Sequence, residues 1–480
     1  MKRSIGPSGP EGVSMETPRR TQHSPTAQST GERRPALAHS RLLTTALVAV
    51  CGLGATALPA AAQPAAAAAQ AAGSLAPAVP PFYTPPTQLP DTNGTLIRTE
   101  PLPLALSLPG VDGPLPGTAT RLMYRSTDSA GRPMAVTGAY IEPAAAWKGK
   151  GPRPVVAFAP GTMGQGDQCS ASLALEHPIA LNEGSVSVGY EALAIYRILS
   201  RGVAVAVTDY AGLGTTDRVH TYVNRVDEGH ALLDVARAAR AVAGASVTSA
   251  SPVGLYGYSQ GGGASAAAAE LQPSYAPDVP LAGTYAGAPP ADLNEVMKGV
   301  DGSSLAAAIG WSVNGMVQSD PSLGPVIDAH LNAAGRAALD RTSTMCVGDA
   351  LLGLGAVSST QWTTEGSSVA QVVDSEPRLK SFIGAQRIGT LKPAAPVRVV
   401  TGVNDDMVTH GQVRKLAVDW CGKGADVTYV PVNLPSLGEK NIVNHFAPLL
   451  TDQGDAISWL VDRLAGKATL SNCWLLPLLP

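Results

Sequence analysis

Short apolar runs alternate with amphipathic stretches along most of the chain. Runs that predict buried strands occur at 154–159, 203–207, 253–256, 281–288, 397–400 and 427–430. Stretches with a helical period lie at 190–200, 226–243, 264–271 and 455–464. In the second of these, Leu232, Val235 and Ala239 lie on one stripe. Apolar strands that alternate with helices predict a parallel sheet with helices on both faces, which is an α/β fold.

Two strands joined by a short turn precede the alternation of strands and helices, and one long helical stretch interrupts it. Residues 119–126 and 134–142 predict a pair of strands joined by a turn at 128–131. Residues 292–386 are mostly of helical type and show no obvious strand. We therefore predict a core in two parts, 91–291 and 387–480, with a mainly helical cap or lid inserted at 292–386.

The first sixty residues have the composition of a targeting segment. Residues 1–41 are polar, residues 42–58 are apolar without a charge, and Ala60–Ala62 resembles a small-residue cleavage site. This predicts a signal peptide at 1–62 and a secreted, extracellular protein. The alternative is a single membrane anchor, but the apolar run is short for a span and is interrupted by glycine and proline near its end.

Two further features belong to this end of the chain. Arg33–Arg34 is a weak match to a twin-arginine export signal. Residues 63–90 are rich in alanine and proline and have no hydrophobic period, so we predict a linker or an extended arm there.

Charge and cysteine content bear on the partners, disulfides and metal sites that can be expected. The formal net charge is -3 and charged residues make up 15% of the chain, with no basic patch, so nucleic acid is not an expected partner. Four of the five cysteines follow the expected leader, and a secreted chain would pair them in two disulfides. Because no Cys/His spacing suggests a metal site, we expect neither a metal nor a cofactor.

The sequence Gly-Tyr-Ser-Gln-Gly at 257–261 stands between a predicted strand and a predicted helix. A G-x-S-x-G turn in that position holds a serine nucleophile at a tight bend, where only glycine fits two residues before and after it. The amide of Gln260, at the start of the helix, would then point toward a developing oxyanion. A plain glycine-rich turn is the alternative, since the chain has 51 glycines, but the flanking strand and helix disfavour it.

A serine nucleophile needs a histidine base and a carboxylate that orients it, in the order Ser, Asp, His on this fold. Strand 397–400 opens into a loop with Asp405 and Asp406. We favour Asp405, which precedes Val408 by three residues as in the Asp-x-x-Val pattern of such loops, and keep Asp406 as its rival. His445 follows the strand at 427–430, and we expect it in a loop.

An oxyanion hole needs a second donor besides Gln260, and the chemistry alone leaves this donor open. Gly161 and Thr162 follow one strand, and Asp209 follows another. Either position suits the loop that usually supplies the donor.

Several motifs resemble those of the secretory lipase family of α/β hydrolases, over roughly Leu122 to Cys473. They are Gly-Tyr-Ser-Gln-Gly-Gly at 257–262, Asp-Tyr-x-Gly-x-Gly at 209–214, Asp-x-x-Val at 405–408 and Cys-Gly-Lys-Gly-Ala-Asp-Val-Thr-Tyr at 421–429, together with the cap. The resemblance implies Ser259 as nucleophile with Asp405 and His445 as its partners. It also implies Asp209 with Gln260 in the oxyanion hole.

Four mature cysteines allow three connectivities. We predict Cys169–Cys346, which would tie the cap to the core, and Cys421–Cys473, which would tie the tail beside the histidine segment.

The expected activity is hydrolysis of carboxylic esters through an acyl-enzyme, with a lipase acting on triacylglycerols as the specific expectation. The substrate would be an ester or a lipid, taken up at a lipid–water interface in the second case, and no stable protein partner is expected. A secreted peptidase or amidase of the same fold and a non-catalytic binding protein are the alternatives. We expect the cap to enclose the acyl chain, so that bulky residues at Ala307 or Gly310 would favour shorter chains.

Overall fold

The computed structural model describes residues 79–107, 116–182 and 185–480. The expected signal peptide at 1–62 and most of the expected arm at 63–90 lie outside these residues. The described end of the arm includes a short 3₁₀ helix, η1 (Pro81–Tyr83), whose Phe82 and Tyr83 side chains are buried. This end of the arm therefore packs on the domain.

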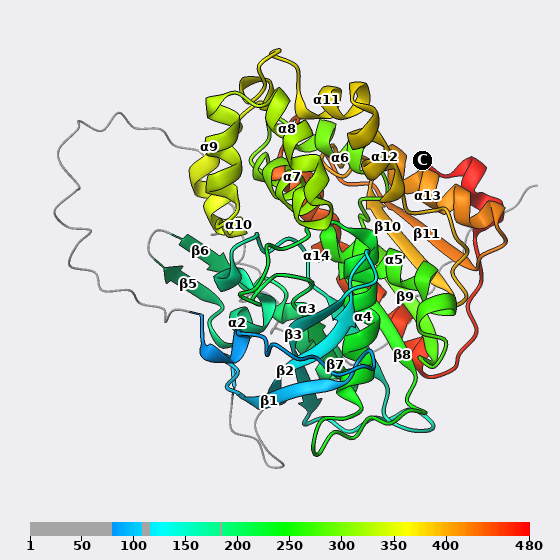
Figure 1. Ribbon diagram of the computed structural model, residues 1–480. Helices are drawn as coiled ribbons and strands as arrows, with labels where there is room; N and C mark the ends of the chain where they lie inside the picture. The colour runs from blue at the N-terminus through cyan, green and yellow to red at the C-terminus, as the bar shows by residue number, and fades with distance from the viewer. Residues whose placement is uncertain (1–78, 108–115, 183–184) are drawn as a thin grey trace, which may run out of the picture. The chain divides into compact units, whose positions relative to one another are not determined.

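A nine-stranded sheet forms the centre of the domain (Figure 1). Its spatial order is β1 (Leu96–Leu102), β2 (Gly117–Thr127), β3 (Pro133–Pro143), β7 (Ala204–Thr208), β4 (Val155–Ala159), β8 (Val253–Tyr258), β9 (Leu281–Gly287), β10 (Val397–Gly402) and β11 (Val427–Val432). The pairs from β1 to β7 are antiparallel, and those from β7 to β11 are parallel. This mostly parallel sheet confirms the predicted fold class.

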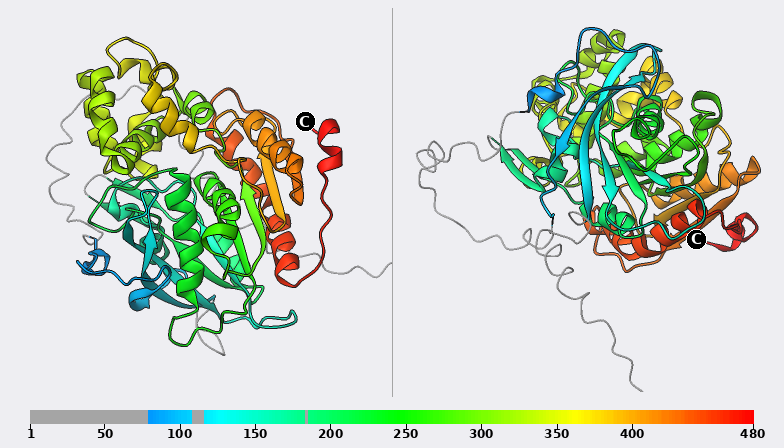
Figure 2. Two further views of the ribbon diagram at one scale, coloured as in Figure 1. Left: turned by 45° about the vertical axis from the view of Figure 1, so that its right-hand side comes forward. Right: turned by 90° about the horizontal axis from the view of Figure 1, so that it is seen from below.

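The two faces of the sheet carry separate apolar cores, because side chains of a strand alternate between faces. In β4, Val155 and Ala157 join one core, and Val156 and Phe158 join the other. The first core is covered by α4 (Arg225–Ala239), α5 (Gln260–Tyr275) and α13 (His410–Gly422), and the second by α3 (Ala192–Leu199) and α14 (Ile442–Leu464) (Figure 2).

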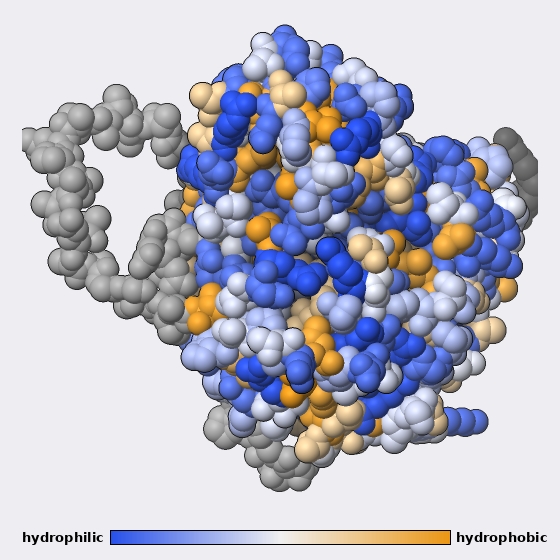
Figure 3. Space-filling view, in the orientation of Figure 1, coloured by the Kyte–Doolittle hydropathy of each residue, from blue (hydrophilic) through white to orange (hydrophobic). Residues whose placement is uncertain are grey.

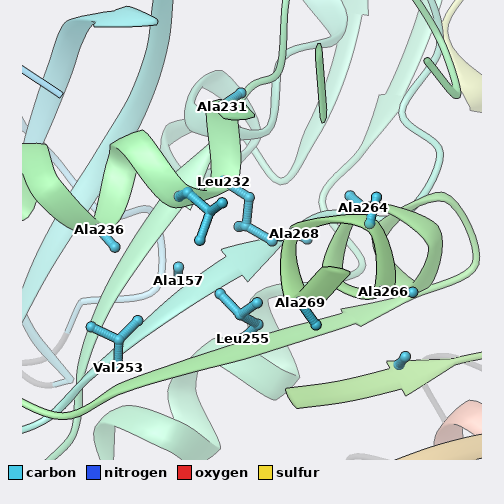
Figure 4. Close-up of a cluster of buried hydrophobic side chains, with 14 of the residues drawn as sticks. Ala157, Ala231, Leu232, Ala236, Val253, Leu255, Ala264, Ala266, Ala268 and Ala269 are labelled. Carbon is cyan, nitrogen blue, oxygen red and sulfur yellow. The ribbon is translucent and has the colours of Figure 1, made fainter. Parts of the chain in front are cut away.

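Small side chains let α5 approach the sheet closely. Ala268 and Ala269 lie beside Leu255 of β8 in Figure 4, with Ala264 farther along the same helix, and all are buried. Alanine leaves little side chain between the helix backbone and the strands, so the helix can start immediately at the end of β8. This close packing fixes the turn between β8 and α5.

Helices replace the alternation between β9 and β10. They are α6 (Leu293–Val300), α7 (Ala307–Ser319), α8 (Gly324–His330), α9 (Ala333–Thr342), α10 (Val347–Asp349), α11 (Val369–Ser375) and α12 (Pro377–Ala385), with short 3₁₀ and π turns between them. They share a core of their own and lie beyond one end of the sheet (Figure 1). On the face in Figure 3, the surface over these helices mixes hydrophilic areas with smaller hydrophobic ones.

Three parts of the fold differ from the expectations. The edge strand β1 was not expected, and its burial pattern shows only weak alternation. A small hairpin of β5 (Ile179–Asn182) and β6 (Ser185–Val188) was also not expected. Helix α14 begins at Ile442, so the segment expected to be a histidine loop is partly helical.

Two disulfides lie in the described chain. One joins Cys169 to Cys346 and the other joins Cys421 to Cys473, which is the connectivity expected from the sequence. The first links the segment after β4 to the start of α10. Among the described helices, none is both long enough and apolar enough to cross a membrane.

Candidate functional site

Ser259 stands at the bend between β8 and α5. Its backbone has φ +57° and ψ -123°, a left-handed conformation that is unusual for a serine, and it occupies the N-cap position of α5. Its amide donates to the Gly287 carbonyl, and its carbonyl accepts from the Gly263 amide, each over about 3 Å. These bonds hold the strained turn from both sides and leave the hydroxyl outside the hydrogen-bonded backbone.

The glycines beside the serine are required by contact with neighbouring backbone. A Cβ atom on Gly257 would lie 2.1 Å from the Gly261 carbonyl oxygen, and one on Gly261 would lie 2.0 Å from the Ala159 carbonyl oxygen. Both distances are far shorter than a tolerable contact. The G-x-S-x-G spacing therefore reflects close packing of this turn against the end of β4.

A hydrogen-bonded series joins Ser259, His445 and Asp405. The Nε2 atom of His445 lies 2.9 Å from the Ser259 hydroxyl oxygen. The Nδ1 atom lies 2.7 Å from Oδ2 of Asp405. Because a carboxylate only accepts, Nδ1 carries a proton and Nε2 is free to accept the serine proton. His445 is 1% exposed and Asp405 is 3% exposed, so this pair is shielded from water, whereas Ser259 is partly exposed toward the pocket.

Asp405 is oriented by the loop that follows β10. Its Oδ1 atom accepts from the amides of Met407 and Val408, each at 3.1 Å, which leaves Oδ2 for the histidine. The Val408 bond explains the Asp-x-x-Val spacing. The carboxylate of Asp406 instead accepts from the Lys440 amide and makes no hydrogen bond to the histidine in the described structure.

His445 lies in the first turn of α14 rather than in a loop. Asn441 caps the helix by accepting from the Val443 amide, and Asn444 holds the preceding loop through bonds to Leu437 and Gly438. The apolar period of α14 is clear only beyond its proline, which is why the pattern predicted a helix from 455 alone. The other nearby histidine, His410, begins α13 beside Tyr429.

The oxyanion candidates fall into two groups. Gln260 is the first residue of α5, where the amide has no partner within the helix, and it lines a pocket together with Ser259 and Thr162. Asp209 is fully buried elsewhere. Its amide donates to the Thr137 carbonyl, and its carboxylate accepts from the amide and hydroxyl of Ser172. The geometry does not support the expectation that Asp209 shares the oxyanion hole, and it favours Thr162.

An apolar pocket opens beside Ser259 and His445, between the core and the cap. Its apolar walls come from Val223, Pro290, Leu293, Val296, Met297, Val300, Leu305, Ala308, Ile309, Met407 and Val408. Leu305, Ala308, Ile309 and Ser312 recur at helical spacing, so one face of the α7 region borders the pocket.

This face does not include the two cap positions expected from the sequence. Ala307 is fully buried and is not a wall residue. A Cβ atom on Gly310 would meet the Thr342 side chain at 2.4 Å. Bulk at Ala307 or Gly310 would therefore disturb packing within the cap, and Ala308 and Ile309 are the positions that face the pocket.

A layer of buried polar groups behind the pocket was not anticipated from the sequence. In the sequence, Glu228 resembles an ordinary acidic residue in the first turn of a helix, here α4, and His220 resembles a histidine in a loop. Burial raises the pKa of Glu228 to about 8 and lowers the pKa of His220 to about 4, because each charged form is poorly solvated there. Glu191 is also buried, and its pKa rises to about 7.

Comparison with known proteins places this chain in a family. The family model described as secretory lipase matches residues 175–472. A relative from Mycobacterium tuberculosis, named as a probable inactive lipase, is 31% identical and is matched over 82% of this chain and 83% of its own length. Lipase A of Arthroderma benhamiae is 26% identical, with 83% of this chain and 81% of the relative covered.

Solved structures agree on the fold. Candida antarctica lipase A in its closed state superposes with a TM-score of 0.68 at 20% identity, covering 82% of this chain and 87% of that one. A rice cell wall degrading esterase, LipA from Xanthomonas oryzae, gives a TM-score of 0.63 at 18% identity, with 78% and 100% covered. From the family match, this chain belongs to the secretory lipase family and is by that membership a lipase-type ester hydrolase.

Proposed function

We propose that this protein is a secreted hydrolase of carboxylic esters, acting on triacylglycerols as a lipase, and that it works through an acyl-enzyme on Ser259. The observation that carries the proposal is the hydrogen-bonded series from Ser259 through the buried His445 to the buried Asp405. The secreted triacylglycerol lipases of Malassezia among its relatives support both the extracellular location and the lipid substrate.

In the first half of the reaction, His445 Nε2 takes the proton of the Ser259 hydroxyl as its oxygen attacks the ester carbonyl carbon. The imidazolium that forms is stabilised by the Asp405 carboxylate at Nδ1. The same Nε2 proton then passes to the departing alcohol oxygen, and the acyl group remains on Ser259. Water activated by His445 cleaves this ester and restores the free serine.

Negative charge develops on the carbonyl oxygen at each tetrahedral step. The amide of Gln260 is one donor to this oxygen. The second donor in our proposal is Thr162, which lies in the loop that follows β4. This loop packs directly against the serine turn. A Cβ atom on Gly161 would lie 3.2 Å from the Tyr258 carbonyl oxygen, which shows how close the two segments are.

The apolar pocket would hold the acyl chain. Its walls come from helices α6 and α7 of the cap and from the loops around Val223 and Met407. Aliphatic side chains favour a hydrocarbon chain over a charged peptide side chain. This composition supports an ester or lipid substrate over a peptide or amide one.

The non-catalytic alternative has a specific observation in its favour, since one relative is named as a probable inactive lipase. That name applies to the relative. In this chain the serine, the histidine and the aspartate are all present and in contact.

Labelling with a serine-directed phosphonate, followed by a panel of ester and peptide substrates, tests the proposal. We expect a single adduct on Ser259 and turnover of esters but not of peptides. An unlabelled protein without ester turnover would favour the binding protein, and turnover of peptides alone would favour the peptidase.

A further inference from the structure

One short segment, His220–Val223, contacts the side chains of both proposed oxyanion residues, and its Tyr222 and Val223 also line the pocket. The Tyr222 hydroxyl lies 2.8 Å from the Thr162 hydroxyl oxygen. The Gln260 side chain donates from Nε2 to Nε2 of His220 over 3.0 Å. The two loops that would supply the donors are thus held by one piece of chain, here called the backing segment.

Glu228 joins the backing segment to the serine turn. Its Oε1 atom accepts from Nε2 of Gln260 at 2.7 Å and from the Val223 amide at 2.9 Å. Both protons of the Gln260 amide group are therefore used, one by Glu228 and one by His220. With its side chain fixed at two points, Gln260 has little freedom to turn its backbone amide away from Ser259.

The Val223 bond holds a strained residue. Val223 has φ +57°, a region that β-branched residues rarely adopt, and it lines the pocket beside Ser259. Such a conformation persists only where surrounding contacts require it. The Glu228 carboxyl supplies one of these contacts, because it accepts from the amide of this residue.

His220 has a fixed role in the same network. Its Nδ1 atom donates to the Ala211 carbonyl at 2.8 Å, so Nε2 carries the lone pair that accepts from Gln260. The ring is fully buried between Tyr210 and Tyr222. A neutral imidazole in one orientation is what this acceptor position needs.

We propose that Glu228 is a positioning residue for ester hydrolysis, which fixes the oxyanion hole by tying the Gln260 side chain to the backing segment. The inference rests on the proposed function and adds a residue to it that touches neither the substrate nor the reacting atoms. Displacements of about 1 Å at such donors cost on the order of 100-fold in rate, so loss of this tie should act on catalysis rather than on substrate binding.

The test compares Glu228→Leu and Glu228→Gln with the parent, using p-nitrophenyl butyrate. For Glu228→Leu we expect kcat to fall about 10- to 100-fold with KM within about twofold, because only the transition state uses the hole fully. For Glu228→Gln we expect most of the rate to be retained, since the amide oxygen can accept the same two bonds. Inhibition by butaneboronic acid, which forms a tetrahedral adduct on serine, should weaken in parallel with kcat/KM.

Glu270 provides the matched control. It is 2% exposed and lies on α5, and its carboxylate bonds to Arg225 and Trp420, away from the pocket. Glu270→Leu should lower the Tm but leave kcat near the parent value. The proposal is overturned if Glu228→Leu keeps the parent kcat, or if Glu270→Leu loses as much kcat for the same loss of Tm.

Tyr222→Phe keeps the inference testable if Glu228→Leu does not fold, because it removes only the hydroxyl that contacts Thr162. A several-fold lower kcat at unchanged KM supports the role of the backing segment, and an unchanged kcat contradicts it. The parent and Ser259→Ala are assayed alongside. An inactive parent would refute the proposed function, whereas an active parent with unchanged variants refutes only this inference.

Discussion

Asp405 and Asp406 are neighbours in the sequence, but their carboxylates have different partners. Asp405 contacts His445, and Asp406 accepts from the Lys440 amide. We expect Asp405→Asn to lower kcat by about 10⁴, because the amide would favour the wrong histidine tautomer. Asp406→Asn should cost far less. Steady-state kinetics of both variants decides the assignment, and the reverse order would move the role to Asp406.

Glu191 offers a prediction about pH. Its Oε1 atom accepts from the Gly161 amide at 2.7 Å, and burial raises its pKa from the ordinary 4.5 to about 7. The folded protein therefore keeps a proton that the unfolded chain releases between these two values. The contribution of this proton to the free energy of unfolding is complete below pH 4.5 and is lost as the pH rises toward 7.

Replacement of Glu191 by glutamine should remove this dependence. Between pH 5 and 6.5, the free energy of unfolding of the parent should fall relative to Glu191→Gln by at most about 1.4 kcal/mol per pH unit. Urea unfolding of both proteins across this range is the measurement. If the free energies of unfolding of the two proteins changed with pH in parallel, Glu191 would be ionised in the folded state at these pH values.

At the scale of elements, α7 brings the cap to the pocket through one face. Ala308→Phe places a ring on that face, where it should shorten the space available to an acyl chain. We expect kcat/KM on dodecanoate esters to fall at least tenfold, about the discrimination that a change of one to a few methylene groups produces in an apolar pocket. Activity on acetate esters should stay close to that of the parent.

Ala337→Phe is the control for this prediction, since Ala337 is an exposed residue of α9 in the same cap. It adds the same bulk away from the pocket and should leave the chain-length profile unchanged. A uniform loss with Ala308→Phe across all chain lengths would show that the cap supports the fold or the catalytic residues instead.

The central strands and the serine turn could be predicted from sequence because their signals are local. Five buried residues in a row define β4, and the glycines around Ser259 follow from backbone contacts within the turn. The start of α14 could not be predicted in the same way. Its first turn contains Asn444, which bonds to the preceding loop, and His445, which bonds to the distant Asp405, so neither residue is fixed by a hydrophobic period.

Residue roles that depend on which loops meet in space could not be assigned from the sequence pattern alone. Asp209 and Thr162 both follow buried strands, and the pattern alone does not say which one faces the serine. The structure shows that the Asp209 carboxylate is used by Ser172. Likewise, Ala307 and Ala308 are adjacent in one helix, and only the packing of α7 on its neighbours shows that the second borders the pocket.

The chemical groups of the molecule lie where the core meets the cap, whose apolar cluster also includes Tyr222 and Met407 of the core. The core contributes Ser259 and His445, and the cap contributes most of the apolar wall. The disulfide between Cys169 and Cys346 links the core to the cap. A site at such a junction can combine a rigid catalytic geometry with a separate apolar wall that selects the substrate.

The catalytic role of Ser259 is tested by measuring ester hydrolysis by the purified parent and Ser259→Ala proteins on the same substrate, p-nitrophenyl butyrate. We predict that the parent turns over and that the variant, with an unchanged fold by circular dichroism, loses about 10⁴- to 10⁶-fold in kcat. An inactive parent, or a Ser259→Ala variant that keeps the parent rate, would contradict the claim that Ser259, His445 and Asp405 form a working hydrolase site.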